Sequence, residues 1–340
     1  MKNKKMVLWI ALILMAIIPV YAQQYDSEKD FQIDWDKNVK DGVVITKYVS
    51  AKKEVRIPPS IKNSPVTGIG KEAFYKNINI TKVIIPNSVI SIGDVAFANC
   101  ENLSSVTIPD SVTSIGRGAF WNCKSLTSVN IPNSLTSIED DVFRYCTSIK
   151  NIIIPNNITS IGDRAFSSCR NLTNVTLPNS VKSIGEGAFA GTNITSITIP
   201  NNVKAIREQA FLGCRNLTNV TLPNSVRGIE KMAFYDCTNL ISVTIGNGVK
   251  SIGEAAFAGC TNLNSIIIGS GVTSIGKWTF SSCTNLTSVT FAEGSKITDY
   301  DFNDLAFIKV EDKYSVNLKE AYLSGGAGTY KLKDDDWIKQ

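Results

Sequence analysis

Apolar and polar residues alternate along this chain in a unit that repeats every 23 residues. The marker of the unit is a phenylalanine, usually preceded by alanine, and one step, from Phe189 to Phe211, shortens to 22 residues. The marker occurs at Phe74, Phe97, Phe120, Phe143, Phe166, Phe189, Phe211, Phe234, Phe257 and Phe280, and a degenerate copy follows at Phe302. Fixed periods in the twenties are typical of a stacked solenoid in which each unit forms one coil.

The first half of each unit predicts a short strand that ends in a turn. In residues 103–123, Val106 and Ile108 alternate with polar neighbours, as in a half-buried strand. Pro109 has no N–H group to donate and therefore ends the strand. Seven units carry proline at this position. Asn or Asp followed by Ser usually comes next, which is the chemistry of a turn.

The second half of the unit returns to the core and bends. Val112 and Ile115 are expected to point inward, and Gly116 suits a sharp bend into a short helical turn that carries Ala119 and Phe120. Three units replace this glycine by a charged residue, at Glu139, Arg207 and Glu230. We therefore expect that the bend does not require a positive φ at this position.

One coil cannot bury its own apolar side, so the coils must stack. Parallel strands lie roughly 4.8 Å apart, and ten coils predict a parallel sheet about 50 Å long. Each phenylalanine then lies on the phenylalanine of the next coil. We expect these buried rows to supply the stability, at about 1.5–3 kcal/mol for each side chain.

All eight cysteines occupy one position, three residues after the phenylalanine. An even number of cysteines in an exported chain is compatible with a disulfide framework. Equivalent Cβ atoms in neighbouring coils would lie near 4.8 Å apart, however, whereas a disulfide prefers about 3.8 Å. Asn77 and Thr192 fill the same position in two other units. We therefore favour a buried column of reduced thiols over disulfides, and over a metal site, for which the spacing offers no clustered ligands.

Composition narrows the possible functions. The chain has 340 residues, is 43% hydrophobic and 19% charged, and contains no histidine. Catalytic sites and zinc sites that depend on histidine are therefore excluded. The net charge of +5 falls to +2 without the three lysines among the first five residues, which is too little to indicate nucleic-acid binding. We expect neither an enzyme nor a cofactor.

The first 22 residues have the pattern of a cleaved export signal. A basic start is followed by the apolar stretch 6–20, and Val20 and Ala22 precede a cleavage point before Gln23. A membrane anchor is the alternative, but the stretch is shorter than the roughly 20 residues of a spanning helix. We expect a secreted or cell-surface protein without a membrane span after cleavage.

The segments that flank the repeats have a different composition. We divide the chain into a signal peptide (1–22), an N-terminal cap with one or two strands (23–54), the solenoid (55–302) and a C-terminal cap (303–340) that includes a short helix over 315–323. Asp34, Asp36 and Asn38 resemble part of a calcium loop, but Val39 and Ile45 stand where an EF-hand needs Gly and Glu. No metal site is expected there.

Two rows of residues are candidates for ligand binding. The strand exposes a row of threonines, and its central members are Thr176, Thr198, Thr221 and Thr244. Isoleucines such as Ile153 and Ile267 interrupt this row elsewhere, and a row of Ser and Asn residues runs beside it. Such a face offers hydrogen bonds to a protein or glycan, although the strand propensity of threonine explains it equally well. The second row is basic and contains Lys182, Lys204, Arg227 and Lys250 from four consecutive coils. It suits an anionic glycan or an acidic protein, or it is only a solvated edge.

Residues 172–189, with the pattern LxxVxLPxSVxxIGxxAF, resemble the BspA-like leucine-rich repeat. The resemblance covers roughly residues 55–302, and residues 41–48 are similar to the opening segment of such proteins. It implies a leucine-rich repeat solenoid and a bacterial surface or secreted protein. Some members act as adhesins for host matrix and other cells. It supplies no catalytic residues.

We therefore expect an exported, monomeric binding module whose partner is a surface protein or an anionic glycan of the host or of a neighbouring cell. The alternative is a structural envelope or matrix protein that self-associates without a dedicated ligand. A concentration series in light scattering would separate these two hypotheses. An enzyme would need an irregular insertion, which the repeats lack.

Overall fold

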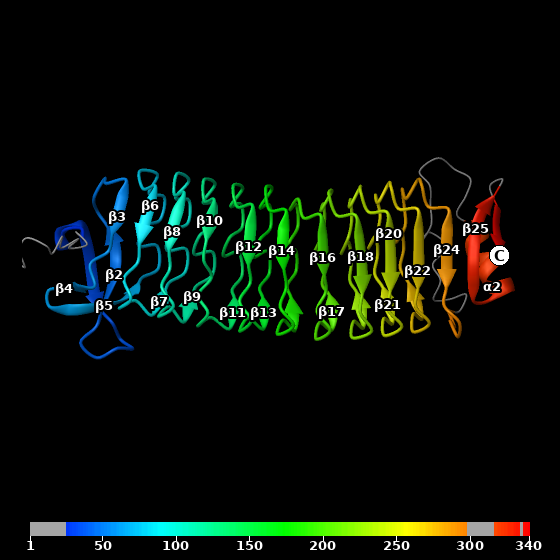
Figure 1. Ribbon diagram of the computed structural model, residues 1–340, viewed down its shortest axis with the longest axis horizontal. Helices are drawn as coiled ribbons and strands as arrows, with labels where there is room; N and C mark the ends of the chain where they lie inside the picture. Colours follow the sequence, from blue (N-terminus) through cyan, green and yellow to red (C-terminus); the bar gives the residue numbers. More distant parts are fainter. Residues whose placement is uncertain (1–24, 298–315, 334–335) are drawn as a thin grey trace, which may run out of the picture.

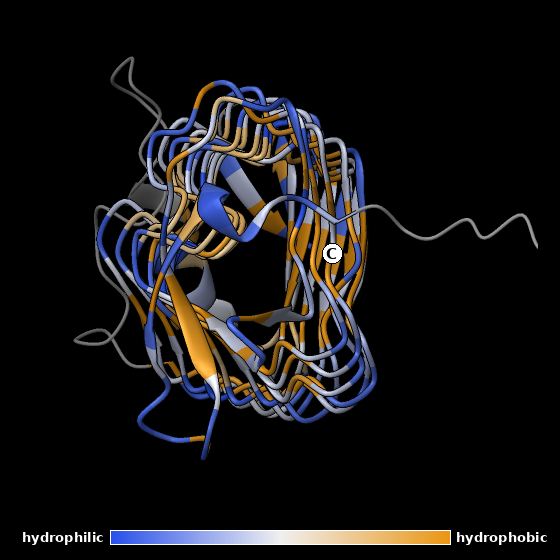
Figure 2. Ribbon diagram, turned by 90° about the vertical axis from the view of Figure 1, so that its left-hand side faces the viewer, coloured by the Kyte–Doolittle hydropathy of each residue, from blue (hydrophilic) through white to orange (hydrophobic). Residues whose placement is uncertain are grey.

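The computed structural model describes residues 25–297, 316–333 and 336–340. The coils stack side by side, so the chain advances steadily from one end of a rod to the other (Figure 1). Viewed along the rod, successive coils superpose in one outline (Figure 2). The predicted solenoid is confirmed, and Phe302, the degenerate eleventh marker, lies outside the described residues.

The predicted strand of each unit forms the first row of strands. Most neighbouring strands of this row pair in parallel with equivalent residues in register, for example Val106 with Val129 and Val220 with Val243. The row consists of β3 (Glu54–Arg56), β6 (Lys82–Ile84), β8 (Ser105–Thr107), β10 (Ser128–Val129), β12 (Asn151–Ile153), β14 (Asn174–Thr176), β16 (Ser196–Thr198), β18 (Asn219–Leu222), β20 (Ser242–Ile245), β22 (Ser265–Ile268) and β24 (Ser288–Phe291).

A second row of short strands, which the sequence pattern did not predict, forms where Val112 and Ile115 return to the core. In Ser114–Ile115 and its equivalents, the isoleucine is buried and the residue before it faces outward. The row consists of β5 (Ser64–Ile69), β7 (Ser91–Ile92), β9 (Ser114–Ile115), β11 (Ser137–Ile138), β13 (Ser160–Ile161), β15 (Ser183–Ile184), β17 (Ala205–Ile206), β19 (Gly228–Ile229), β21 (Ser251–Ile252) and β23 (Ser274–Ile275).

The segment around the phenylalanine is a sequence of turns, and the predicted helical turn is wrong. Phe120 N donates to Val142 O in the next coil at 3.0 Å, whereas Cys123 N donates to Phe120 O within its own coil at 3.3 Å. Hydrogen bonds therefore alternate between coils and within a coil. This alternation needs left-handed residues, such as Gly118 and Asn122, at two positions of the coil.

Gly116 itself does not have a positive φ, as predicted from its replacement in other coils. A Cβ atom at Gly116 would lie 2.5 Å from the backbone nitrogen of Asp94 in the preceding coil. The glycine therefore allows a close approach between two coils.

The phenylalanines form a continuous column along the rod. From Phe74 to Phe280 the ring centroids of consecutive coils lie 4.7–5.7 Å apart and the rings are nearly parallel. Tyr48 continues the column at the N-terminal end, 5.1 Å from Phe74. Neither row of strands is paired across the 22-residue step, between β14 and β16 or between β15 and β17, but the column is unbroken there.

The eight cysteine side chains lie beside this column, free and buried, as predicted. Each Sγ lies within hydrogen-bonding distance of the carbonyl oxygen of the phenylalanine in the preceding coil, for example Cys123 Sγ to Phe97 O at 3.2 Å. Burial raises the pKa of Cys100, Cys169 and Cys283 to about 12. These thiols are therefore protonated in the folded protein at neutral pH.

Additional elements cover the two ends of the rod. At the N-terminal end, η1 (Glu28–Asp30) leads into β1 (Phe31–Trp35), which pairs antiparallel with β2 (Val43–Tyr48), and β4 (Ser60–Ile61) pairs with β5. At the C-terminal end, β25 (Gly328–Lys333) and β26 (Asp336–Lys339) extend the first row antiparallel. The helix predicted over 315–323 is α2 (Val316–Gly325), and its predicted N-cap, Ser315, lies outside the described residues.

Candidate ligand-binding site

The threonine row lies on the outer side of the first row of strands. Thr198, Thr221 and Thr244 are register partners in β16, β18 and β20, and all three are exposed. Thr176 in β14 is also exposed and pairs with Ile153. The structure therefore places the four predicted residues on one face, with the break between β14 and β16 separating Thr176 from the others.

This face also carries exposed apolar side chains. Ile153, in register with Thr176, is 83% exposed, and Ile267, in register with Thr244, is 45% exposed. In the neighbouring Ser/Asn row, side chains bond across coils, as from Ser242 Oγ to Asn219 Oδ1 at 2.8 Å. From β8 to β24 the strand face is uncharged and partly apolar.

The basic row lies directly before the second row of strands. Backbone hydrogen bonds join three of its members, from Arg227 N to Lys204 O and from Lys250 N to Arg227 O, both at 2.7 Å. Lys182 N donates in the same way to Thr159 O. Lys182, Lys204, Arg227 and Lys250 are all exposed. Four cations from consecutive coils therefore lie along one edge, as predicted.

Ion pairs do not neutralise this edge. Among the described residues, no carboxylate lies within 4.0 Å of the charged nitrogens of these four side chains. The Arg227 guanidinium donates instead to the backbone oxygen of Asn224 at 2.6 Å. The segments 177–184, 199–206, 222–229 and 245–252, which contain the row, carry no acidic residue. The edge keeps a local excess of positive charge.

The basic row and the threonine row lie on different parts of the coil. The turn after the first strand separates them in each of the four coils, so Thr176 belongs to β14 while Lys182 precedes β15. The two rows form two separate candidate surfaces.

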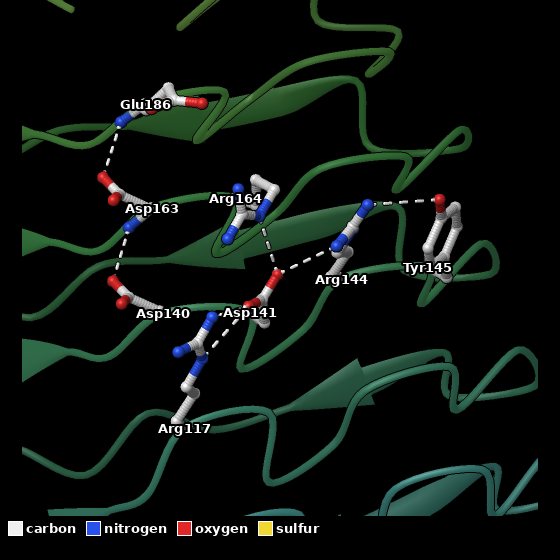
Figure 3. A network of polar contacts seen from close by, with 8 residues as sticks. All are labelled: Arg117, Asp140, Asp141, Arg144, Tyr145, Asp163, Arg164 and Glu186. Atoms are coloured by element: carbon white, nitrogen blue, oxygen red, sulfur yellow. Dashed lines mark hydrogen bonds and ion pairs between the residues drawn. The ribbon is translucent and has the colours of Figure 1, made fainter.

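The turn segment also holds a cluster of charges that sequence reasoning missed. Asp141 accepts hydrogen bonds from Arg117, Arg144 and Arg164 of three consecutive coils, at 3.1–3.3 Å (Figure 3). Burial acts to raise the pKa of Asp141, but the Arg164 and Arg117 guanidiniums outweigh it and hold this pKa below its ordinary value. The spacing of Arg117, Asp141 and Arg164, near one 23-residue step, could have indicated the cluster.

The repeat family described as BspA type leucine-rich repeat region matches residues 67–194 and 182–309, which together exceed half of the chain. The chain belongs to this family. Repeat proteins of the BspA type are bacterial surface proteins and generally act as interaction modules rather than enzymes.

Solved structures include similar leucine-rich proteins. A leucine-rich cell surface protein of Faecalibacterium prausnitzii shares 29% identity over 84% of this chain and 94% of its own, with a TM-score of 0.58. A leucine-rich repeat protein of T. pallidum shares 29% identity, over 71% and 91%, with a TM-score of 0.41. One from Bacteroides ovatus shares 25% identity, over 83% and 98%, with a TM-score of 0.49. A search of curated proteins found no match.

Two further observations bear on the kind of site that this BspA-type chain offers. Within the described ranges, no group of three or more His, Cys, Asp or Glu residues could hold a metal ion. In the same residues, no helix is long and apolar enough to cross a membrane. The predicted signal peptide lies outside the described residues.

Proposed function

We propose that this protein is an exported, adhesin-like surface module that binds an anionic glycan along the basic row. The observation that carries the proposal is the alignment of four exposed cations in consecutive coils, which form no ion pair with any other described residue and whose segments 177–184, 199–206, 222–229 and 245–252 contain no acidic residue. The signal pattern of residues 1–22 and the similarity to a cell surface protein support export.

The spacing of the row suits a polymer with regularly repeated negative charges. Neighbouring coils lie about 5 Å apart, so the four cations span about 15 Å over three steps. A sulfated or carboxylated glycan can contact several of them at once. Because the backbone of the row is fixed by hydrogen bonds between coils, only the side chains have to be ordered on binding.

The test compares heparin binding by the wild type and by the row variant K182T/K204T/R227T/K250T in low and physiological salt. The equivalent positions in other coils are Thr159 and Thr273, so the variant should fold. We expect the row variant to lose about tenfold or more of its affinity in low salt, because attraction to a polyanion scales with local charge. The wild type should bind more weakly at physiological salt, where exposed charges are screened over about 8 Å.

A matched control removes the same charge elsewhere. Lys47, Lys150, Arg170 and Lys277 are exposed and form no ion pair in the part of the chain that the structure describes. Their simultaneous replacement by Thr should leave most of the heparin affinity. Equal affinity of the wild type and the row variant, with unchanged circular dichroism, would remove the basic row as the site.

The strand face supports a second candidate function, the binding of a surface protein. The observation that favours it is Ile153, an 83% exposed apolar side chain in register with Thr176. An apolar anchor within a regular polar face is a common feature of protein interfaces. On an array of matrix proteins, I153T should reduce any binding by the strand face and leave heparin binding unchanged. If I153T binds like the wild type, the strand face is not the protein-binding surface.

A further inference from the structure

A hollow of about 430 Å³ lies on the turn side of the solenoid, near its N-terminal end. Val95, Gly118 and Trp121 line it together with charged residues from four consecutive coils. Its volume lies within the range of about 300–1,000 Å³ that is usual for small-molecule sites. The basic row belongs to later coils, so the hollow is a separate feature.

The absence of a side chain at Gly118 leaves space for the hollow. Gly118 occupies a position where the next two coils carry Asp141 and Arg164, all with positive φ. A Cβ atom at Gly118 would lie 3.2 Å from Val95 Cγ1 and 3.6 Å from Trp121 Cβ. A longer side chain at this position would therefore fill the space between Val95 and Trp121.

The lining combines an aromatic side chain with fixed planar polar groups. Trp121 is half-buried and stands at a position where other coils carry small residues such as Ala98 and Ala190. The Arg117 guanidinium is held on Asp141 by two hydrogen bonds to one oxygen, yet its side chain is 61% exposed. The guanidinium is thus positioned before any ligand arrives, which lowers the entropic cost of binding.

The charges of the lining cancel. Three cations and three carboxylates line the hollow: Lys71, Arg117 and Arg144, and Glu72, Asp94 and Asp141. Neither a polyanion nor a cation is favoured by this balance. A neutral ligand with hydroxyl groups and one apolar face fits it, because hydroxyls both donate to carboxylates and accept from guanidiniums.

We propose that this hollow binds a neutral pyranose unit of a glycan, with the sugar ring against Trp121 and its hydroxyls on Arg117 and the neighbouring carboxylates. Pyranose rings present apolar C–H groups on a face and hydroxyls at the rim, which matches an indole beside charged planar groups. Binding at this site is independent of the basic row.

The test measures binding of maltotriose, cellotriose, mannotriose and tri-N-acetylchitotriose by titration calorimetry, with trigalacturonic acid as the anionic probe. We expect at least one neutral trisaccharide to bind with a dissociation constant of about 1 mM, with little dependence on salt. Trigalacturonic acid should bind no more tightly. Absence of binding by all four neutral sugars at about 20 mM would overturn the proposal.

Two pairs of variants locate the binding. W121A introduces the alanine that other coils carry at this position, and it should weaken sugar binding about tenfold. Y235A is the control: it changes the equivalent exposed position of a distant coil and should not weaken sugar binding. G118Q fills the hollow with the residue that Gln209 supplies in its own coil, and it should abolish binding, while G187Q at the equivalent position should not. Wild-type affinity in both W121A and G118Q would contradict the proposed site. Heparin binding should be unchanged in all four variants.

Discussion

At the scale of the residue, each position of the coil is defined by what it meets in the neighbouring coil. The cysteine position shows this clearly, since each Sγ lies within hydrogen-bonding distance of a phenylalanine carbonyl of the preceding coil. At Thr192 the hydroxyl makes a similar bond within its own coil, to Phe189 O at 2.8 Å. In these coils the position holds a buried hydrogen-bonding group, and Thr192 shows that it does not need a thiol.

The burial of the cysteines makes their reactivity a test of folding. In the absence of reductant, unfolding in denaturant should release eight titratable thiols per chain. The folded protein should react slowly with a thiol reagent, because burial both raises the pKa and blocks access. Fewer than about six thiols on unfolding would contradict the interpretation of this column as reduced side chains.

The raised thiol pKa values also predict a loss of stability at alkaline pH. The pKa values of Cys100, Cys169 and Cys283 rise from an ordinary 9.0 to about 12 on folding. Unfolding above pH 9 therefore releases protons, so the stabilisation is complete below about pH 9 and is lost progressively between about 9 and 12. Each thiol changes the free energy of unfolding by up to about 1.4 kcal/mol per pH unit.

Urea unfolding between pH 8 and pH 11 measures this dependence. Replacement of Cys100, Cys169 and Cys283 by Ala should flatten the slope by up to about 4 kcal/mol per pH unit. An unchanged slope in the triple variant would show that these thiols do not titrate on unfolding.

At the scale of the element, the coil is the unit of structure and its interior is the phenylalanine column. Phe166 is fully buried between Phe143 and Phe189, at 5.5 and 5.4 Å. The neighbouring coils are fixed by their own hydrogen bonds and cannot close around a missing ring. Truncation of one phenylalanine in this column should therefore leave a cavity and destabilise the folded protein.

Phe166→Ala should lower the free energy of unfolding by about 3–5 kcal/mol, because it removes a buried ring and leaves a cavity. Chemical denaturation of the wild type and the variant measures the difference. Tyr235→Ala is a suitable control, because that ring is 38% exposed and should cost far less. A silent Phe166→Ala would contradict the central role of the column.

At the scale of the whole molecule, the solenoid is a sum of similar coils with covered ends. Each coil pairs with its immediate neighbours, as Val220 in β18 pairs with Ile197 in β16 and Val243 in β20. Such an arrangement tolerates the loss of one whole unit if the new neighbours match in register.

Deletion of residues 234–256, one complete 23-residue unit, should therefore leave a folded, shorter rod. Small-angle X-ray scattering should show a maximum dimension about 5 Å shorter than that of the wild type. The circular dichroism spectrum should keep the shape of the wild-type spectrum. Unfolding of this deletion variant would contradict the stacked-coil description.

The candidate surfaces could be predicted from the sequence only in part. Counting by 23 residues places Lys182, Thr198 and their equivalents in rows, because stacked coils repeat side-chain positions. The lack of ion pairs between the basic row and the other described residues, and the 83% exposure of Ile153, depend on side chains of neighbouring coils. The sequence pattern carries no information about such lateral contacts.

The sequence by itself determined the 23-residue period of the coils, the first row of strands, the phenylalanine column and the burial of the cysteines, because each follows from a periodic pattern within one unit. Only the tertiary structure decided the second row of strands, the alternating bonds that replace the helical turn, and the hollow beside Gly118. Segments of two or three residues, such as Ser114–Ile115, become strands only when the equivalent segment of the next coil supplies the hydrogen bonds. The hollow likewise arises beside Gly118, between Trp121 of the same coil and Val95 of the preceding coil. Both depend on contacts between coils, which no single unit contains.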